Sequence, residues 1–180
     1  PVDFYAILPL LATGYSDGTV ILYNLQTSPP NIQYELKYHI YMVHCVVFHP
    51  TQPCLATCSF DNTAIIYNMT TSLPTKQHHL KYHTNLVTSI AFHSSFPLFV
   101  TGSRDKTAIL YDLTTTPATI QHHLKNHRYC ISAVAFHPHL LVLATTSLDK
   151  PVILYNISGS TPVIKYHLKH HRGYVRCVTF

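Results

Sequence analysis

Histidine is the most abundant residue of this chain that can both bind metals and transfer protons, with 15 copies among 180 residues. Imidazole does both near neutral pH, so a metal site or a general base is the first possibility to test. His78 and His79 are adjacent in a segment with strand-like composition, as are His122 and His123. Adjacent side chains of a strand point to opposite faces, so these pairs do not indicate a metal site.

Acidic residues are too few and too scattered for acid–base catalysis, since the chain has only 7 Asp and Glu. Four of them occupy equivalent turn positions and are assigned a structural role: Asp17, Asp61, Asp105 and Asp149. The other three stand at unrelated positions: Asp3, Glu35 and Asp112. The sequence contains no paired carboxylates, Ser-His-Asp arrangement or glycine-rich phosphate loop. We therefore expect that the chain is not an enzyme.

Cysteine usage and hydropathy indicate an intracellular protein. The 5 cysteines form an odd set spread through strand-like segments, which is typical of free thiols in the reducing cytoplasm or nucleus. Cys54 and Cys58 lack a second ligand pair at the spacing of a zinc site. No apolar run is long enough for a membrane helix, and the start has no signal-peptide pattern. Because the first residue is not Met, we interpret the sequence as a processed chain or a piece of a longer one.

A repeat of 44 residues runs through the whole chain. Five residue types recur in this register without insertion or deletion: Phe at 4, 48, 92, 136 and 180; His at 39, 83, 127 and 171; Asp at 17, 61, 105 and 149; Tyr at 23, 67, 111 and 155; and Thr at 13, 57, 101 and 145. Such self-similarity is the signature of a repeat architecture, in which each unit is one small group of secondary-structure elements.

Each unit contains four strand-like pieces. In the second unit they are Val43–Phe48, Cys54–Ser59, Ala64–Asn68 and about Lys76–Lys81, with a tight turn at Phe60–Thr63. No segment shows the apolar spacing of a helix. Four short strands per repeat predict an all-β fold, a propeller of four blades with four antiparallel strands each. Histidines at equivalent positions then belong to different blades and cannot share an ion, so we expect no metal site and no cofactor.

The repeat also divides the chain. Residues 1–36 form the first blade, 37–80, 81–124 and 125–168 the next three, and 169–180 the first strand of a following blade or a closing strand. The innermost strand of the first blade is mostly missing or is supplied by residues 173–180. Part of a larger propeller is the favoured arrangement, and a closed four-bladed ring is the alternative. If four blades are the whole chain, two chains can also pair, and self-association is then expected.

The third repeat has the clearest family pattern, in His83, Val87–Phe92, Val100–Thr107 and Ile109–Asp112. Over essentially its whole length the sequence resembles the WD40 repeat family. The resemblance implies that a polar tetrad locks each blade, and the tetrads would be His39, Thr57, Asp61 and Tyr67; His83, Thr101, Asp105 and Tyr111; and His127, Thr145, Asp149 and Tyr155. The chain departs from the family in having no Trp, so tyrosine stands at the fourth tetrad position. The usual Gly before the loop histidine is also missing.

The resemblance further implies a non-catalytic scaffold that mediates protein–protein interaction within a macromolecular assembly. Family partners contact the residue before each turn Asp and two positions at the start of each innermost strand. Transferred to this chain, the partner-binding positions are Phe60, Arg104, Leu148, Met42, His44, Leu86, Thr88, Cys130, Ser132, Tyr174 and Arg176. Apolar and aromatic groups beside arginines are the composition expected of an interface core.

Basic residues gather at the loops expected on the same face, and the net charge of the chain is +5. This basic rim consists of Lys37, Lys81, Lys125, Lys169, Arg128, Arg172, Lys106 and Lys150. It is either a solvated rim that maintains solubility or a surface for an anionic partner such as an acidic protein segment. Binding of nucleic acid or another polyanion through this face is the alternative function. No membrane partner is expected.

Overall fold

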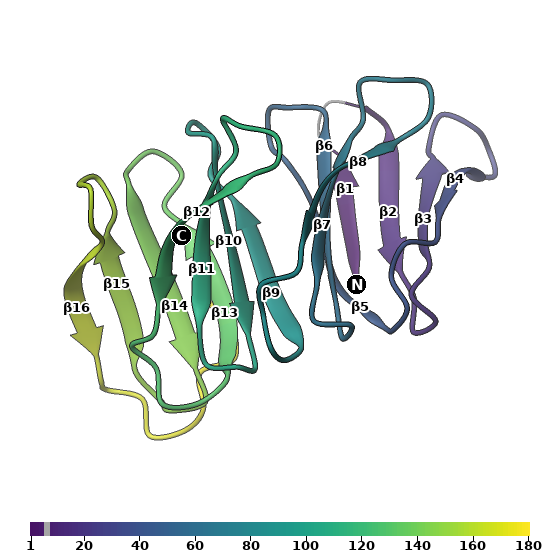
Figure 1. The fold of residues 1–180 in the computed structure, drawn as a ribbon. Helices are drawn as coiled ribbons and strands as arrows, with labels where there is room; N and C mark the ends of the chain where they lie inside the picture. Colours follow the sequence, from purple (N-terminus) through teal and green to yellow (C-terminus); the bar gives the residue numbers. More distant parts are fainter. Residues whose placement is uncertain (6–7) are drawn as a thin grey trace.

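All regular structure in the computed structural model, which describes residues 1–5 and 8–180, is β-strand. The strands form four sheets of four antiparallel strands, each made from consecutive strands of the chain. The all-β, four-blade prediction is confirmed. Figure 1 shows the four sheets side by side in chain order, from the purple first sheet to the yellow-green fourth.

The strand bounds repeat almost unchanged from sheet to sheet. The first sheet contains β1 (Val2–Tyr5), β2 (Leu10–Gly14), β3 (Val20–Asn24) and β4 (Asn31–Leu36). The second contains β5 (Val43–Phe48), β6 (Cys54–Ser59), β7 (Ala64–Asn68) and β8 (Thr75–Leu80). The third contains β9 (Val87–Phe92), β10 (Leu98–Ser103), β11 (Ala108–Asp112) and β12 (Thr119–Leu124). The fourth contains β13 (Ile131–Phe136), β14 (Val142–Ser147), β15 (Val152–Asn156) and β16 (Val163–Leu168).

The turn between the second and third strands of each sheet needs a left-handed backbone. Gly18 has φ 91°, and the three residues at the equivalent position have φ between 69° and 80°: Asn62, Lys106 and Lys150. Glycine adopts this conformation without steric cost, whereas a lysine side chain does not. A side chain at Gly18 would also clash with the carbonyl oxygen of His39. Asn62 also tolerates this conformation, so only in the third and fourth sheets, where lysine stands there, must the surrounding chain fix the turn.

Three apolar cores lie between consecutive sheets. The core between the first and second sheets joins Leu22 and Leu36 of one to Leu55, Ile65 and Tyr67 of the other. Residues at the same repeat positions build the cores between the second and third and between the third and fourth sheets. The central strands of the inner sheets are therefore apolar on both faces, which explains their nearly continuous runs of buried residues.

The two ends of the row are open. The innermost position of the first sheet is held by β1, which pairs with β2 through Val2–Tyr5. Residues 169–180 form no strand, and ring closure is not detected among the described residues. That the innermost strand of the first blade is mostly missing or is supplied by residues 173–180 stays a prediction. The chain's own N-terminal segment already bonds to that edge of β2.

Candidate interaction surface

A histidine, a threonine and an aspartate are bonded together in each of the last three sheets. In the second sheet, Nδ1 of His39 lies 2.8 Å from Oδ2 of Asp61, and its Nε2 lies 2.7 Å from Oγ1 of Thr57. The third and fourth sheets repeat these contacts at 2.6–2.9 Å, through His83 with Thr101 and Asp105 and through His127 with Thr145 and Asp149. Each triad ties the loop before the innermost strand to the turn between the next two strands.

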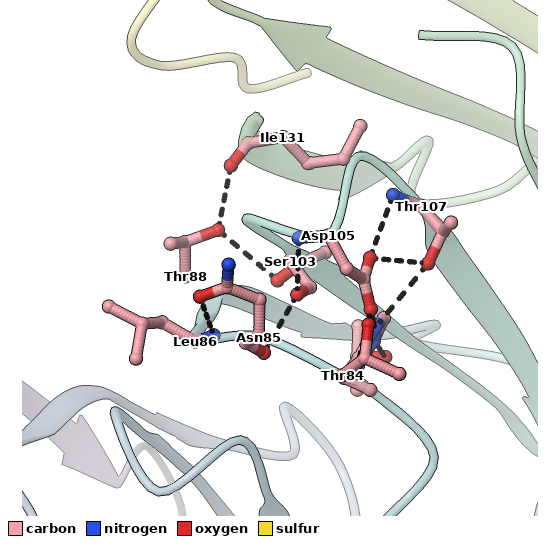
Figure 2. Close-up of polar contacts among 11 residues, drawn as sticks. Thr84, Asn85, Leu86, Thr88, Ser103, Asp105, Thr107 and Ile131 are labelled. Atoms are coloured by element: carbon pink, nitrogen blue, oxygen red, sulfur yellow. Dashed lines mark hydrogen bonds and ion pairs between the residues drawn. The ribbon is translucent and has the colours of Figure 1, made fainter. Parts of the chain in front are cut away.

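The turn aspartate also collects backbone bonds from both loops, as Figure 2 shows for the third sheet. The amide of Thr84 donates to Oδ2 of Asp105, and the amide and hydroxyl of Thr107 donate to Oδ1. Burial alone would raise the pKa of this carboxyl, but the hydrogen bonds from His83 and Thr107 outweigh it and hold the pKa well below its usual range. Asp61 shows the same balance of burial and bonding. Both carboxylates are therefore structural anions, and their oxygens already accept hydrogen bonds from within the sheet.

None of the three tyrosine hydroxyls forms a hydrogen bond with its own triad in the described part of the chain. Among the described residues, the buried hydroxyls of Tyr67 and Tyr111 have no hydrogen-bond partner. The hydroxyl of Tyr155 donates instead to Oδ1 of Asn126, at 3.1 Å. Where the fourth sheet has Asn126, the second and third have tyrosines whose rings pack on Tyr67 and Tyr111. A phenol hydroxyl lies farther along the side chain than an indole N–H, which accounts for this departure from the expected tetrad.

A serine that sequence reasoning missed adds a further link in each of the last three sheets. Oγ of Ser103 donates to the carbonyl of Asn85 at 2.9 Å and accepts the amide hydrogen of Asp105 (Figure 2). Ser59 and Ser147 make the same two contacts in their own sheets. The signal was present in the sequence, because these serines are also 44 residues apart. Together with the triads, they hold the loops of one face in a fixed position.

The structure brings the partner-binding positions of each sheet into contact. The residue before the turn aspartate bonds through its backbone amide to the carbonyl of a residue beside the innermost strand. These bonds are Phe60 to Met42 at 3.0 Å, Arg104 to Leu86 at 2.9 Å and Leu148 to Cys130 at 3.2 Å. All of these side chains are half-buried except that of Arg104, which is exposed.

A β-bulge positions the second residue of the innermost strand in the second, third and fourth sheets. The register passes from Val43 opposite Ser59 to Cys45 opposite Cys58, so His44 is the extra residue. Thr88 and Ser132 are the extra residues of the equivalent bulges in the third and fourth sheets. A bulge re-aims a side chain that regular pleating would direct elsewhere. The position of the bulge depends on strand register, which the sequence did not reveal.

The same positions line one groove of about 390 Å³. Eight of the eleven predicted partner-binding residues line it, and the groove spans sheets two to four and the segment after them. Its lining is His44, Thr88, Arg104, Cys130, Ile131, Ser132, Leu148, Tyr174 and Arg176. Phe60 is not part of the lining but contacts two residues that are. The Arg104 guanidinium stands 5.6 Å from the centre of the Phe60 ring, and the His44 ring stacks on the Phe60 ring at 5.0 Å. Met42 and Leu86 lie outside the lining.

Positive charge dominates the groove. Arg104 and Arg176 contribute two guanidinium groups, and no carboxylate is among the lining residues. Burial, reinforced by the charge of Arg104, lowers the pKa of His44, so its imidazole is neutral at physiological pH. The hydroxyls of Thr88 and Ser132 donate hydrogen bonds to the carbonyls of Ile131 and Val175, so these donors are not free for a ligand. The groove offers two cations, an apolar floor and an imidazole.

The basic rim is exposed but does not form part of this groove. All eight of its residues are exposed to solvent: Lys37, Lys81, Lys125, Lys169, Arg128, Arg172, Lys106 and Lys150. Lys37 pairs with Glu35 at 3.0 Å, on the surface. Arg128, Lys150 and Lys169 line a separate depression on the fourth sheet.

Within residues 1–5 and 8–180, no cluster of three or more His, Cys, Asp or Glu side chains has the geometry to hold a metal ion. The same part of the chain has no disulfide, and its cysteines are Cys45, Cys54, Cys58, Cys130 and Cys177. It also has no helix long and apolar enough to cross a membrane.

Consecutive four-stranded antiparallel sheets, locked by a repeated His-Thr-Asp triad and presenting loops on a shared face, define a β-propeller repeat protein. The family model of the WD domain, G-beta repeat, matches residues 31–68, 74–112 and 118–156, more than half of the chain. The chain therefore belongs to the WD40 family. Each match runs from the outermost strand of one sheet to the third strand of the next, so every sequence repeat joins two blades. The comparison with curated proteins finds no match.

Proposed function

We propose that this chain is a protein-interaction scaffold that binds an acidic segment of a partner protein in the groove between Arg104 and Arg176. WD40-repeat proteins are generally non-catalytic scaffolds for protein–protein interaction. The finer proposal rests on one observation, a groove with two guanidinium groups and no carboxylate among its lining residues. Guanidinium groups bind carboxylates through paired, charge-assisted hydrogen bonds.

The apolar part of the groove favours a peptide over a simple polyanion. Leu148 and the exposed Tyr174 ring offer area to an aliphatic or aromatic side chain beside the two arginines. Interface hot spots combine arginine and aromatic side chains in this way, with a polar surround that excludes water. The chemistry therefore fits a segment in which acidic residues flank an apolar one.

The experiment is a binding titration with a labelled peptide in which glutamates flank a single leucine. Reversing one charge, by Arg104→Glu or Arg176→Glu, should weaken binding at least about tenfold, which corresponds to about 1.4 kcal/mol. Lys125→Glu makes the same charge change on the basic rim, outside the groove, and should weaken binding only slightly. Equal losses for all three variants would contradict a specific groove.

A single-stranded DNA oligonucleotide tests the polyanion alternative in the same titration. Phosphate binding releases counterions and weakens steeply with added salt, whereas a mixed apolar and ionic contact weakens less. Tighter binding of the oligonucleotide than of the peptide, with a steep salt slope and equal sensitivity to Lys125→Glu, would favour the polyanion function instead.

A further inference from the structure

Two cysteines stand opposite each other on neighbouring strands of the second sheet. The register of β5 and β6 pairs the Cα atoms of Cys45 and Cys58, next to the β-bulge at His44. Both side chains belong to the core between the second and third sheets, whereas Val46 packs in the core on the other face. Opposite residues of antiparallel strands have Cα atoms about 4.5–5.5 Å apart, which lies within the range of about 4.4–6.8 Å that a disulfide needs. The two thiols are thus placed to form one.

The repeat does not require this pair of thiols. The residues at the equivalent positions of the other sheets are Pro1 and Gly14, Ser89 and Gly102, and Ala133 and Thr146. Cys54 is also on β6 but lies four residues from Cys58, about 13 Å along the strand, and cannot reach it. Facing thiols therefore distinguish the second sheet from the other three.

The surroundings give the two thiols different reactivities. Cys45 is partly exposed, so a small oxidant reaches it, whereas Cys58 is fully buried. A hydrogen bond with the Cys58 thiol lowers the pKa of Cys45, and this effect outweighs that of burial. Burial raises the pKa of Cys58 well above its ordinary value. Because the thiolate is the nucleophile, Cys45 is the thiol that an oxidant attacks first.

We propose that Cys45 and Cys58 form a reversible redox modification site, which hydrogen peroxide converts from two thiols to a disulfide. The Cys45 thiolate attacks one peroxide oxygen and the O–O bond breaks. Cys45 becomes a sulfenic acid, and the departing hydroxide takes up the proton that Cys45 had released. The Cys58 sulfur then attacks the Cys45 sulfur, and the S–S bond forms as the sulfenic hydroxyl leaves with the Cys58 proton. The two thiols lose two electrons, and the peroxide gains them and becomes two waters.

The Cys45 sulfur also joins the second sheet to the third. It accepts a hydrogen bond from the amide of Ile90 on β9. The next pair of sheets has the same contact, in which Oγ of Ser89 accepts the amide hydrogen of Val134 at 3.1 Å. A disulfide draws the Cys45 sulfur toward Cys58 on its own sheet. Oxidation should therefore weaken this bond between the innermost strands of two sheets.

The groove of the proposed function lies beside this contact. Its lining includes His44, which is adjacent to Cys45, and Thr88, which is two residues from Ile90. Oxidation should therefore change the groove where its lining passes from the second sheet to the third, and should weaken peptide binding. This effect on binding rests on the proposed function, whereas the formation of the disulfide does not.

Peptide mapping by mass spectrometry tests the disulfide. The exposed thiol of Cys177 is first removed by Cys177→Ser, so that chains do not cross-link through it. The folded chain is treated with hydrogen peroxide, and its remaining thiols are then alkylated in denaturant. A peptide linked through Cys45 and Cys58 should appear and should be lost after dithiothreitol. Cys54→Ser is the matched control, and the same linked peptide should form in it.

Two variants test the order of the steps. Cys58→Ala removes the second thiol, so a sulfenic acid should accumulate at Cys45 and react with dimedone. Cys45→Ser should give no dimedone adduct at Cys58. Serine and glycine stand at these positions in the third sheet, so both variants should fold, and circular dichroism verifies this. Full alkylation of Cys45 and Cys58 after peroxide treatment would overturn the proposal, as would a linkage through Cys54.

A titration with the glutamate–leucine peptide tests the effect on the groove. The oxidised chain should bind about fivefold more weakly than the reduced chain, at the low end of typical couplings between two sites. Dithiothreitol should restore binding, which it would not do if peroxide acted through oxidation of Met42. Unchanged affinity in a chain that carries the disulfide would overturn the effect on the groove. Absence of peptide binding by the reduced chain would instead contradict the proposed function, and the mapping would still decide whether the disulfide forms.

Discussion

The phenol of a tyrosine stands where the family has an indole, and the consequence differs from sheet to sheet. Tyr111 is fully buried, and its hydroxyl has no partner among the described residues, whereas the hydroxyl of Tyr155 donates to Asn126. A buried polar group without a partner costs free energy that a paired one does not. The same residue type in the same repeat position thus has two different energetic roles.

Replacing these tyrosines with phenylalanine should separate the two roles. Tyr111→Phe removes an unpaired hydroxyl and should leave the free energy of unfolding unchanged or slightly higher. Tyr155→Phe removes a hydrogen bond and leaves the Asn126 oxygen unpaired, so it should lower that free energy by about 1 kcal/mol. Urea denaturation measures both. An equal loss in the two variants would show that the Tyr111 hydroxyl is bonded after all.

The triads show how far single residues could be predicted. The family resemblance, applied to residues that recur every 44 positions, named every triad histidine, threonine and aspartate in advance, and the structure joins them at 2.6–2.9 Å. The free hydroxyl of Tyr111 could not be predicted, because it depends on how far a phenol reaches past its neighbours. The linking serines could have been found from the same spacing, since Ser59, Ser103 and Ser147 share one repeat position.

At the scale of the elements, a histidine that follows the innermost strand in the second, third and fourth sheets packs on a phenylalanine one repeat later. Nδ1 of His93 accepts the amide hydrogens of Ser95 and Phe96, and its ring packs on Phe136 of the next sheet. His49 and His137 accept equivalent pairs of amides. An imidazole that accepts at Nδ1 must be neutral there, so these contacts require the unprotonated form.

These contacts predict a loss of stability in mild acid. Burial lowers the pKa of His93 below its usual 6.5, and the nearby His137 and His139 lower it further. Because the unfolded state then binds the proton more readily, the stabilising contribution is complete above the usual pKa and is lost as pH falls below it. Thermal unfolding between about pH 7 and about pH 5 should therefore show a falling midpoint.

The control for this prediction is His93→Asn, which keeps an acceptor for the two amides but does not titrate. This variant should be less stable than the wild type at neutral pH, because it loses ring packing on Phe136. Its midpoint should nevertheless change less between neutral and mildly acidic pH. An unchanged pH dependence would place the acid sensitivity elsewhere in the chain.

Strand positions were predictable, whereas strand register was not. The predicted strands Val43–Phe48, Cys54–Ser59 and Ala64–Asn68 coincide with β5, β6 and β7, and the fourth differs from β8 by one residue at each end. Composition and turn residues determine where a strand begins and ends. The bulge at His44 depends on which residues face each other across two strands, and no local pattern reports that.

At the scale of the whole molecule, the groove exists only because several sheets contribute to it. Its residues come from the loops and innermost strands of three sheets and from the segment that follows them. The family resemblance located these positions, but their meeting in one groove depends on the packing of the sheets. The triads and serines that fix the loops therefore determine the shape of the surface, even though they do not line it.

Hydrogen–deuterium exchange of the chain, with and without the glutamate–leucine peptide, tests the central claim most directly. The account predicts slower exchange in the loops and strand starts at residues 42–44, 86–88, 102–105, 130–132 and 174–176, which surround the groove. Exchange in the outermost strands β4, β8 and β12 should not change. Protection confined to the outermost strands or to the basic rim, with residues around Arg104 unaffected, would contradict a partner-binding groove at this face.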